Sequence, residues 1–465
     1  MLKEDPTLSL VYFYFDYSDA TKQDCRALAS SIVFQLAMYS GKCQAYLQQR
    51  QSYRSPTYDE LLVLLSGLLD LSGRTFIVID ALDECPERTR GRTGLARFFE
   101  HLCSLRNENV VDLHVFVTSR PEIDIQNCML PLATHTLNLN VAREHTEDIR
   151  NYLSTRMFGL ESEPFSNWDE STKWRVYNVL LERSNGMFLW VVLQLQDLQD
   201  CSPNDVDHAL DELPSDLDST YERILKNFPS KTTMITRARR IFECVVFAHD
   251  TLSPTEVADI PLLDLTSEPP RVALTSDVHT ENPETIVLRT CPRLLEIMLD
   301  KDGKNTVQLI HRSVGEYLAS STLRRATSSP AYAYSFDESS ANLTLAKICL
   351  LVLIADSTPL GLQKYADEHW DKHVSLRNED ALSELLDLFL CTDSPAFARW
   401  TGVRSKSITW QCNDTALHCA ARLGLSRHVE RVLDRSRLDL ANLVDTRDRN
   451  GKTALHTAAR SGRVE

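Results

Sequence analysis

The stretch Phe76–Glu84, FIVIDALDE, decides the fold of the front of this chain. Its opening run is apolar without alternation, a pattern typical of a strand in a parallel sheet that helices cover on both faces. Two further segments have strand composition, Leu10–Phe15 and Leu113–Thr118, and apolar residues recur at helical spacing in Asp24–Tyr39 and Tyr58–Leu71. Strands that alternate with helices predict an open α/β sheet, whose ligands bind at the carboxyl ends of the strands.

Carboxylates stand directly after this strand. Asp80 ends it, and Asp83 and Glu84 follow one turn later. A carboxylate held beside a phosphate crevice can hold Mg²⁺ through water, and a second one can orient or deprotonate an attacking water. The alternative is structural, because carboxylates also stabilise the start of a helix. Arg120, at the end of the next strand, could reach a γ-phosphate, and its alternative is a surface arginine near a turn.

A phosphate site of this kind also needs a glycine-rich turn, GxxxxGK[ST], whose backbone N–H groups and lysine hold the phosphates. Gly-Lys pairs begin at Gly41, Gly303 and Gly451, and none of them completes the pattern. We therefore expect the cradle to belong to a segment upstream of Met1. We also expect the chain as it stands to bind ATP very weakly, because carboxylates repel phosphate unless a cation neutralises the charge.

Three segments of the front part carry a resemblance to a known family. They are LVYFYFDYSDATKQDCRALASSIVFQLA, RTFIVIDALDEC and HVFVTSRPE. Together they resemble the NACHT-type P-loop domain in its nephrocystin-like form, which is found in large fungal ankyrin-repeat proteins. The resemblance implies that Asp80 binds Mg²⁺ and that Asp83 or Glu84 activates the hydrolytic water. It also implies that Arg120 senses phosphate. The implied cofactors are Mg²⁺ and ATP or GTP, if a P-loop is supplied upstream. His311, in VQLIHRSVGEYLAS, is the candidate nucleotide sensor, with a structural histidine as the alternative.

The expected fold class is multidomain, α/β followed by α. The resemblance divides the chain into five parts: a truncated P-loop α/β domain (1–137), a helical lid (138–235), a winged-helix domain (236–328), a helical spacer (329–405) and incomplete ankyrin repeats (406–465). The repeats have their own signal, because TALHxAARxG begins at Thr415 and again at Thr453. The apolar run Ile348–Ala355 is too short to span a bilayer and predicts a buried helix.

Composition limits the partners and the compartment. The formal net charge of −15 and the pI near 5.4 repel a phosphate backbone, so nucleic acid is not an expected partner. The 12 cysteines form no CxxC pair, as expected of reduced thiols in the cytoplasm. The chain start lacks the basic region of a signal peptide. We expect a cytoplasmic protein without a membrane span, which binds a protein partner through its ankyrin repeats. The sequence leaves open whether the protein forms a homo-oligomer on activation.

Three functions remain at this stage. The motif order favours a nucleotide-regulated signalling scaffold of the NACHT–ankyrin type, defective in nucleotide binding while the P-loop is absent. The absent cradle makes a non-catalytic ankyrin adaptor the alternative. An active ATP or GTP hydrolase is favoured least, because Asp80 and Glu84 would have to work without a phosphate cradle.

Overall fold

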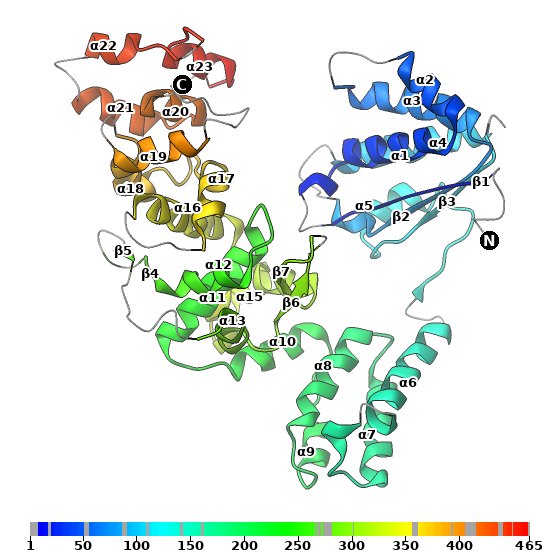
Figure 1. Ribbon diagram of the computed structural model, residues 1–465. Helices are drawn as coiled ribbons and strands as arrows, with labels where there is room; N and C mark the ends of the chain where they lie inside the picture. The colour runs from blue at the N-terminus through cyan, green and yellow to red at the C-terminus, as the bar shows by residue number, and fades with distance from the viewer. Residues whose placement is uncertain are drawn as a thin grey trace. The chain divides into compact units, whose positions relative to one another are not determined.

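The computed structural model describes most of the chain, namely residues 8–16, 20–50, 55–85, 91–107, 111–139, 143–159, 162–265, 267, 271–272, 281–300, 302–355, 361–391, 394–404, 415–435, 440–448 and 450–463. The chain divides into two compact units, Met1–Ala142 and Arg143–Glu465 (Figure 1). The first is a mixed α/β unit built on a parallel sheet, and the second is mainly helical. The predicted combination of α/β and α architecture is therefore confirmed at this level.

The sheet of the first unit has three parallel strands in the order β1 (Leu8–Tyr14), β2 (Arg74–Asp80) and β3 (Leu113–Val117). All three strands were predicted from their composition, within two residues at each end. The register places Tyr14 beside Asp80. Because the strands are parallel, their carboxyl ends meet at one edge of the sheet, where the predicted site residues lie.

One face of the sheet is covered by α1 (Cys25–Tyr39), α2 (Gly41–Gln48), α3 (Tyr58–Leu71) and α4 (Gly91–Asn107) (Figure 1). The side chain of Asp24 caps α1, and Thr57 forms a capping box with Glu60 at the start of α3. The apolar side chains between the helices and the sheet make one core with Ile125 of α5 (Ile123–Met129). Helices α1 and α3 were predicted, whereas α2 and α4 were not.

The opposite face of the sheet is exposed in the part of the chain that the structure describes. The side chains of Tyr12 and Phe116 are 55% and 63% exposed, and Val78 lies between them in the register. The expected helical cover on both faces is therefore present on one face only among the described residues. The residues of β2 point alternately to the covered and to the exposed face, and apolar residues stand on both, which gives the continuous apolar run.

The second unit begins with helices around a core that contains Trp168 and Trp190. Trp190 Nε1 donates a hydrogen bond of 3.0 Å to the carbonyl of Pro214. The helix α8 begins at Phe188, after a turn in which Asn185 and Gly186 have positive φ angles of 47° and 75°. The helices are α6 (Arg143–Phe158), α7 (Glu170–Arg183), α8 (Phe188–Gln199), α9 (Val206–Asp211) and α10 (Leu217–Lys226).

The middle of this unit combines helices with two short antiparallel strand pairs, β4–β5 and β6–β7. Ser253 caps α12, and Pro254 stands at its first position, where proline is favoured. The winged-helix assignment of this region stays a prediction. The elements are α11 (Thr232–Phe247), α12 (Pro254–Asp259), β4 (Leu263–Asp264), β5 (Arg271–Val272), α13 (Pro283–Thr290), β6 (Leu295–Leu299), β7 (Asn305–Leu309), α14 (Arg312–Leu318) and α15 (Ser321–Arg325).

The rest of the unit is helical. The run Ile348–Ala355 lies in the buried helix α16 (Glu338–Ile354), as predicted. Thr415 and Thr453 are the N-cap residues of α20 and α23, which pack on each other. Residues 405–414, at the start of the predicted repeats, lie outside the described residues. The remaining helices are α17 (Gln363–His373), α18 (Ser383–Phe389), α19 (Pro395–Arg404), α20 (Ala416–Leu423), α21 (Ser426–Arg435), α22 (Leu440–Asp445) and α23 (Ala454–Arg460).

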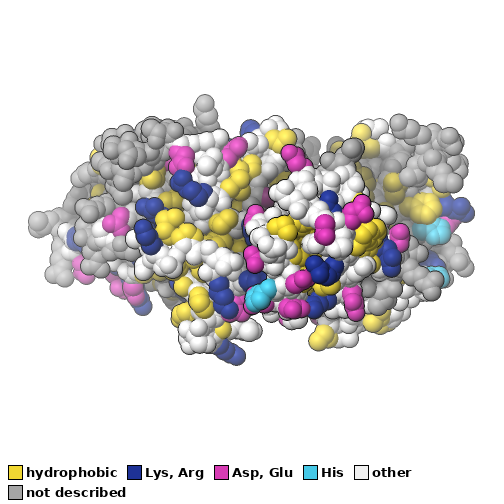
Figure 2. All heavy atoms as spheres, turned by 90° about the horizontal axis from the view of Figure 1, so that it is seen from below, with side chains coloured by type: hydrophobic (Ala, Val, Ile, Leu, Met, Phe, Trp, Pro, Cys, Tyr) yellow, Lys and Arg dark blue, Asp and Glu magenta, His cyan; other side chains and the backbone are white. Residues whose placement is uncertain are grey.

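Two surface properties bear on partners. Across the described residues, no helix combines the length and apolar character that crossing a membrane requires. On the face drawn in Figure 2, acidic and basic side chains are interspersed with hydrophobic ones. That face therefore presents no broad area of one charge sign.

Candidate functional site at the carboxyl edge of the sheet

Asp80 ends β2, and its carboxylate is held by the neighbouring strand. The hydroxyl of Thr118, directly after β3, donates a hydrogen bond to Oδ1 of Asp80. The same hydroxyl accepts a hydrogen bond of 3.0 Å from the backbone N–H of Ala81. Ala81 has the left-handed backbone angles φ 55° and ψ 50°, so the chain turns sharply after the strand. Thr118 thus fixes an exposed carboxylate at the strand end, a role that the sequence analysis did not assign to it.

Asp83 and Arg120 meet at this edge. The backbone N–H of Arg120 donates to Oδ1 of Asp83 over 3.1 Å, and Nε of its guanidinium lies 3.4 Å from Oδ2. The Asp83 side chain is 6% exposed, whereas that of Arg120 is 36% exposed. A buried carboxylate with both oxygens directed at one arginine is suited to hold that arginine in place. The structure therefore brings together two residues that the sequence proposed separately.

Glu84 lies in the same short turn as Asp83. Its backbone N–H donates to the carbonyl of Ala81 over 2.9 Å, and its side chain is half-buried. Asp80, Asp83 and Glu84 therefore occupy one tight turn beyond β2, with Arg120 reaching it from the end of β3.

Arg92 of α4 fastens this turn, and the sequence analysis missed it. Its guanidinium donates to the carbonyls of Asp83 and Cys85, each over 3.1 Å. It also pairs with Glu122 and Asp124 at the start of α5, at 2.6 and 2.5 Å. Burial acts to lower the pKa of Arg92, but the hydrogen bonds that it donates to the two carboxylates, together with their charges, outweigh burial and raise that pKa. Arg92 thus joins the carboxylate turn to α5.

Lys22 adds a further cation at the end of β1. Its Nζ lies 3.5 Å from Oδ2 of Asp16 and 4.4 Å from the centre of the Tyr14 ring. Tyr14 is in turn the register partner of Asp80. The edge of the sheet that carries the acids therefore also carries lysine and arginine side chains, the two residue types that bind phosphate most often.

His311 belongs to the second unit, at the junction of β7 and α14. Its Nδ1 accepts a hydrogen bond of 3.2 Å from the backbone N–H of Ser313 and lies 2.7 Å from the Ser313 hydroxyl. That hydroxyl also lies 2.7 Å from the hydroxyl of Tyr221. The imidazole therefore caps α14, as the structural alternative expects. Its role as a nucleotide sensor stays a prediction.

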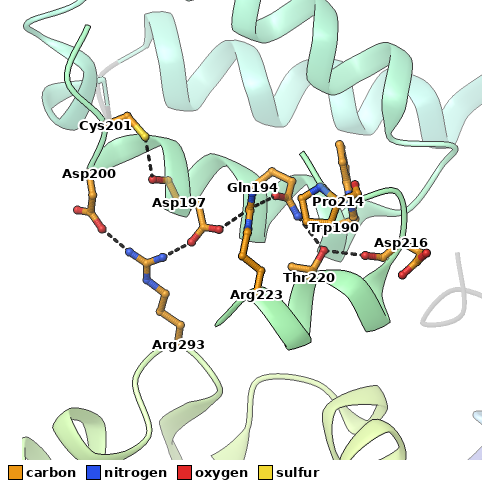
Figure 3. A network of polar contacts seen from close by, with 10 residues as sticks. All are labelled: Trp190, Gln194, Asp197, Asp200, Cys201, Pro214, Asp216, Thr220, Arg223 and Arg293. Atoms are coloured by element: carbon orange, nitrogen blue, oxygen red, sulfur yellow. Dashed lines mark hydrogen bonds and ion pairs between the residues drawn. The ribbon is translucent and has the colours of Figure 1, made fainter. Parts of the chain in front are cut away.

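A second cluster of ion pairs lies in the same unit (Figure 3). Arg293, just before β6, reaches between Asp197 of α8 and Asp200 at its end. Arg223 of α10 donates to Asp197 and also to Gln194, which is fully buried. Arg293 has a positive φ angle of 64°, a conformation that disfavours any residue except glycine. The sequence analysis singled out none of these side chains.

Comparison with known proteins identifies the front of the chain. Residues 1–120 match the family model described as nephrocystin 3, N-terminal. This part of the chain is similar to that family. The nephrocystin-type segment contains the sheet and every candidate residue of its edge, so the predicted resemblance is confirmed.

Two curated fungal proteins are similar to this chain. The azaphilone pigments biosynthesis cluster protein L of Monascus ruber is 27% identical over 213 residues, which cover 42% of this chain and 43% of that protein. The vegetative incompatibility protein HET-E-1 of Podospora anserina is 22% identical over 332 residues, which cover 68% of this chain and 22% of that protein. The chain therefore matches less than half the length of either relative.

Among solved structures, the Orc1 protein of Aeropyrum pernix in complex with DNA is similar at 15% identity, over 66% of this chain and 76% of that one. The TM-score is 0.26, a value too low to show a common fold.

Proposed function

We propose that this chain is part of a nucleotide-regulated signalling scaffold of the NACHT–ankyrin type, whose switch is Mg²⁺ with ATP or GTP at the carboxyl edge of the sheet. The observation that carries the proposal is the contact of Asp83 with Arg120, since it joins the acidic turn after β2 to the arginine after β3. The match of residues 1–120 to the nephrocystin 3 N-terminal family model supports it.

The geometry suggests a division of work within the site. Asp80, exposed and oriented by Thr118, is the group that would hold Mg²⁺. Asp83 would position Arg120 rather than activate water, because both of its oxygens face that residue. Glu84 then remains as the group that would orient the hydrolytic water, and the partly exposed guanidinium of Arg120 would stabilise charge on the γ-phosphate.

The absent phosphate cradle would be supplied by a segment outside this sequence. Strand β3 is at the edge of the three-stranded sheet, and the aromatic face with Tyr12 and Phe116 is uncovered among the described residues. A further strand beside β3, followed by a helix on that face, would give the sheet the double cover that parallel sheets usually have. It would also bring a glycine-rich turn to the carboxyl edge.

Titration with a fluorescent ATP analogue in the presence of Mg²⁺ tests the proposal. The chain alone should bind very weakly, and low-micromolar affinity would contradict our interpretation. The chain extended by a segment with GxxxxGK[ST] should bind. In that extended chain, Asp80→Ala should weaken binding, whereas Glu84→Gln should preserve binding and slow hydrolysis. Asp70→Asn, a matched change at an exposed acid of α3, should alter neither.

The helices after Thr415 support a second role, recognition of a protein partner by ankyrin repeats. The TALH segments form α20 and α23, and these two helices pack on each other as stacked repeats would. If the extended chain fails to bind any nucleotide while its fold is intact, the non-catalytic adaptor becomes the better description.

A further inference from the structure

Three side chains with metal-ligand chemistry meet in the second unit, away from the sites described above. Asp250 follows α11, and Glu368 and His369 are neighbours in α17. Nε2 of His369 lies 2.6 Å from Oδ2 of Asp250 and 4.0 Å from Oε2 of Glu368. One ligand atom from each residue lies within 4.8 Å of the other two. This separation is close to that of ligands around a single metal ion.

The imidazole of the cluster is held rigidly. His369 is 5% exposed, and its ring lies 4.8 Å from the ring of Tyr365 and 6.1 Å from that of His249, measured between centres. These aromatic neighbours direct Nε2 towards the two carboxylates. An imidazole held in this way presents Nε2 as a metal ligand without rearrangement of the ring.

The two carboxylates are accessible from water. The Asp250 side chain is 64% exposed and that of Glu368 is 46% exposed. An ion can therefore enter without unfolding the unit, and water molecules can complete its coordination. Both side chains can also adjust, since tetrahedral zinc requires ligand atoms about 3.3 Å apart when its bonds are about 2.0 Å. From its distance of 2.6 Å to Nε2, Asp250 would move outwards, and from its distance of 4.0 Å Glu368 would move inwards.

We propose that Asp250, Glu368 and His369 form a binding site for a transition-metal dication of the zinc class, which joins α17 to the end of α11. The donor set decides the class, because one nitrogen and two carboxylate oxygens suit zinc, cobalt or manganese, whereas calcium and magnesium prefer oxygen alone. Two carboxylates also balance the double charge of the ion. Asp250 and His369 are 119 positions apart, so a bound ion would cross-link distant parts of the unit.

Lys372 opposes binding of the ion. Its Nζ lies 2.9 Å from Nδ1 of His369, so an ammonium there donates to Nδ1 and leaves the imidazole proton on Nε2, facing Asp250. When an ion binds Nε2, that proton leaves and one proton arrives at Nδ1, so the imidazole stays neutral. The exposed Lys372 side chain must then turn away. The site is therefore weaker with the lysine than without it.

The test is a titration of the full chain with Co²⁺, followed by visible absorption, since cobalt bound to nitrogen and oxygen lacks the near-ultraviolet bands of a thiolate complex. We expect one such site in the unchanged chain. His369→Gln should abolish it, and Glu368→Gln should weaken it by about tenfold or more. Glu384→Gln, a matched change at an exposed acid of α18, should leave it intact.

Two further measurements sharpen the test. Lys372→Met should bind Co²⁺ about tenfold more tightly, because the competing ammonium is gone. Zn²⁺ should raise the Tm of the unchanged chain by more than that of Glu368→Gln, because the variant binds the ion more weakly. Identical isotherms for the unchanged chain, His369→Gln and Glu368→Gln would overturn the proposal. Displacement of Co²⁺ by equimolar Ca²⁺ would also overturn it, because the imidazole could not then be a ligand.

Discussion

A carboxylate pairs with arginine both at the edge of the sheet and in the cluster of Asp197, Arg223 and Arg293. Only the pair at the edge of the sheet can be recognised in the sequence. Asp83 and Arg120 are 37 positions apart and follow two neighbouring parallel strands. Asp197 and Arg293 are 96 positions apart, and one lies on a helix surface while the other lies in a turn. The carboxyl ends of parallel strands lie at the same edge of a sheet, whereas the sequence of a helix surface does not indicate which distant segment it will contact.

The two pairs also differ in how the charge is compensated. Asp83 is nearly buried and faces one arginine, while Asp197 is 16% exposed and faces both Arg223 and Arg293. Loss of Asp83 removes the acceptor of the Arg120 backbone N–H and an ion-pair partner of its guanidinium. The arginine side chains of the two pairs are similarly exposed, at 36% for Arg120 and at 28% and 34% for Arg223 and Arg293. The Asp83 carboxylate is the more deeply buried of the two, so the first pair should contribute more to stability.

Substitution at Asp83 should have the largest effect. Asp83→Ala should destabilise the first unit by about 3 kcal/mol, since one partner of a nearly buried ion pair is removed. Hydrogen exchange of the Ile77–Ile79 amides, read by mass spectrometry, measures this. Asp112→Ala is the control, because that exposed carboxylate pairs with Arg74 at the opposite end of the sheet and should change exchange little. Equal effects of the two changes would contradict the positioning role of Asp83.

Acid should destabilise the second unit. Burial, with the charges of His249, His369 and Lys372, lowers the pKa of His373 from an ordinary value near 6.5 to about 3. Between these values the unfolded chain binds a proton and the folded chain does not. The stability is therefore full above pH 6.5 and falls below it, by up to about 1.4 kcal/mol per pH unit.

Tryptophan fluorescence can follow this loss in the second unit alone, because residues 1–142 contain none of the six tryptophans. Urea unfolding at several pH values gives the slope of stability against pH. His373→Gln should reduce that slope between pH 6.5 and 4. An unchanged slope would show that His373 is accessible to protons in the folded state.

Asp197→Ala should have a smaller effect than Asp83→Ala, about 2 kcal/mol, because the Asp197 carboxylate is 16% exposed and that of Asp83 only 6%. Urea unfolding followed by tryptophan fluorescence measures it, since Trp190 lies in the same helix. Asp200→Ala removes a carboxylate that is 73% exposed and should cost less than about 1 kcal/mol. A larger effect at Asp200 than at Asp197 would reverse the interpretation of the cluster.

Backbone strain at Arg293 should give the smallest effect. Both Arg293→Ala and Arg293→Gly remove the guanidinium, but only glycine adopts a φ angle of 64° without penalty. The glycine variant should therefore be more stable than the alanine variant by about 1 kcal/mol. The same unfolding experiment compares them, and equal stabilities would argue against a left-handed conformation at this position.

Much of the first unit could be predicted because its signals are local. The composition of β1, β2 and β3 and the apolar spacing of α1 and α3 reveal these elements directly. Helices α2 and α4 were missed, because both mix apolar residues with polar and charged ones.

The sequence by itself determined which residues form the strands, which acids follow β2, and that these acids share an edge with Arg120. Only the tertiary structure decided that Asp83 faces Arg120, that Thr118 holds Asp80, and that Arg92 fastens the turn. It alone also decided the meeting of Asp250 with His369. The physical reason is that secondary structure follows from local periodicity, whereas each ion pair depends on the path of the chain between its two partners.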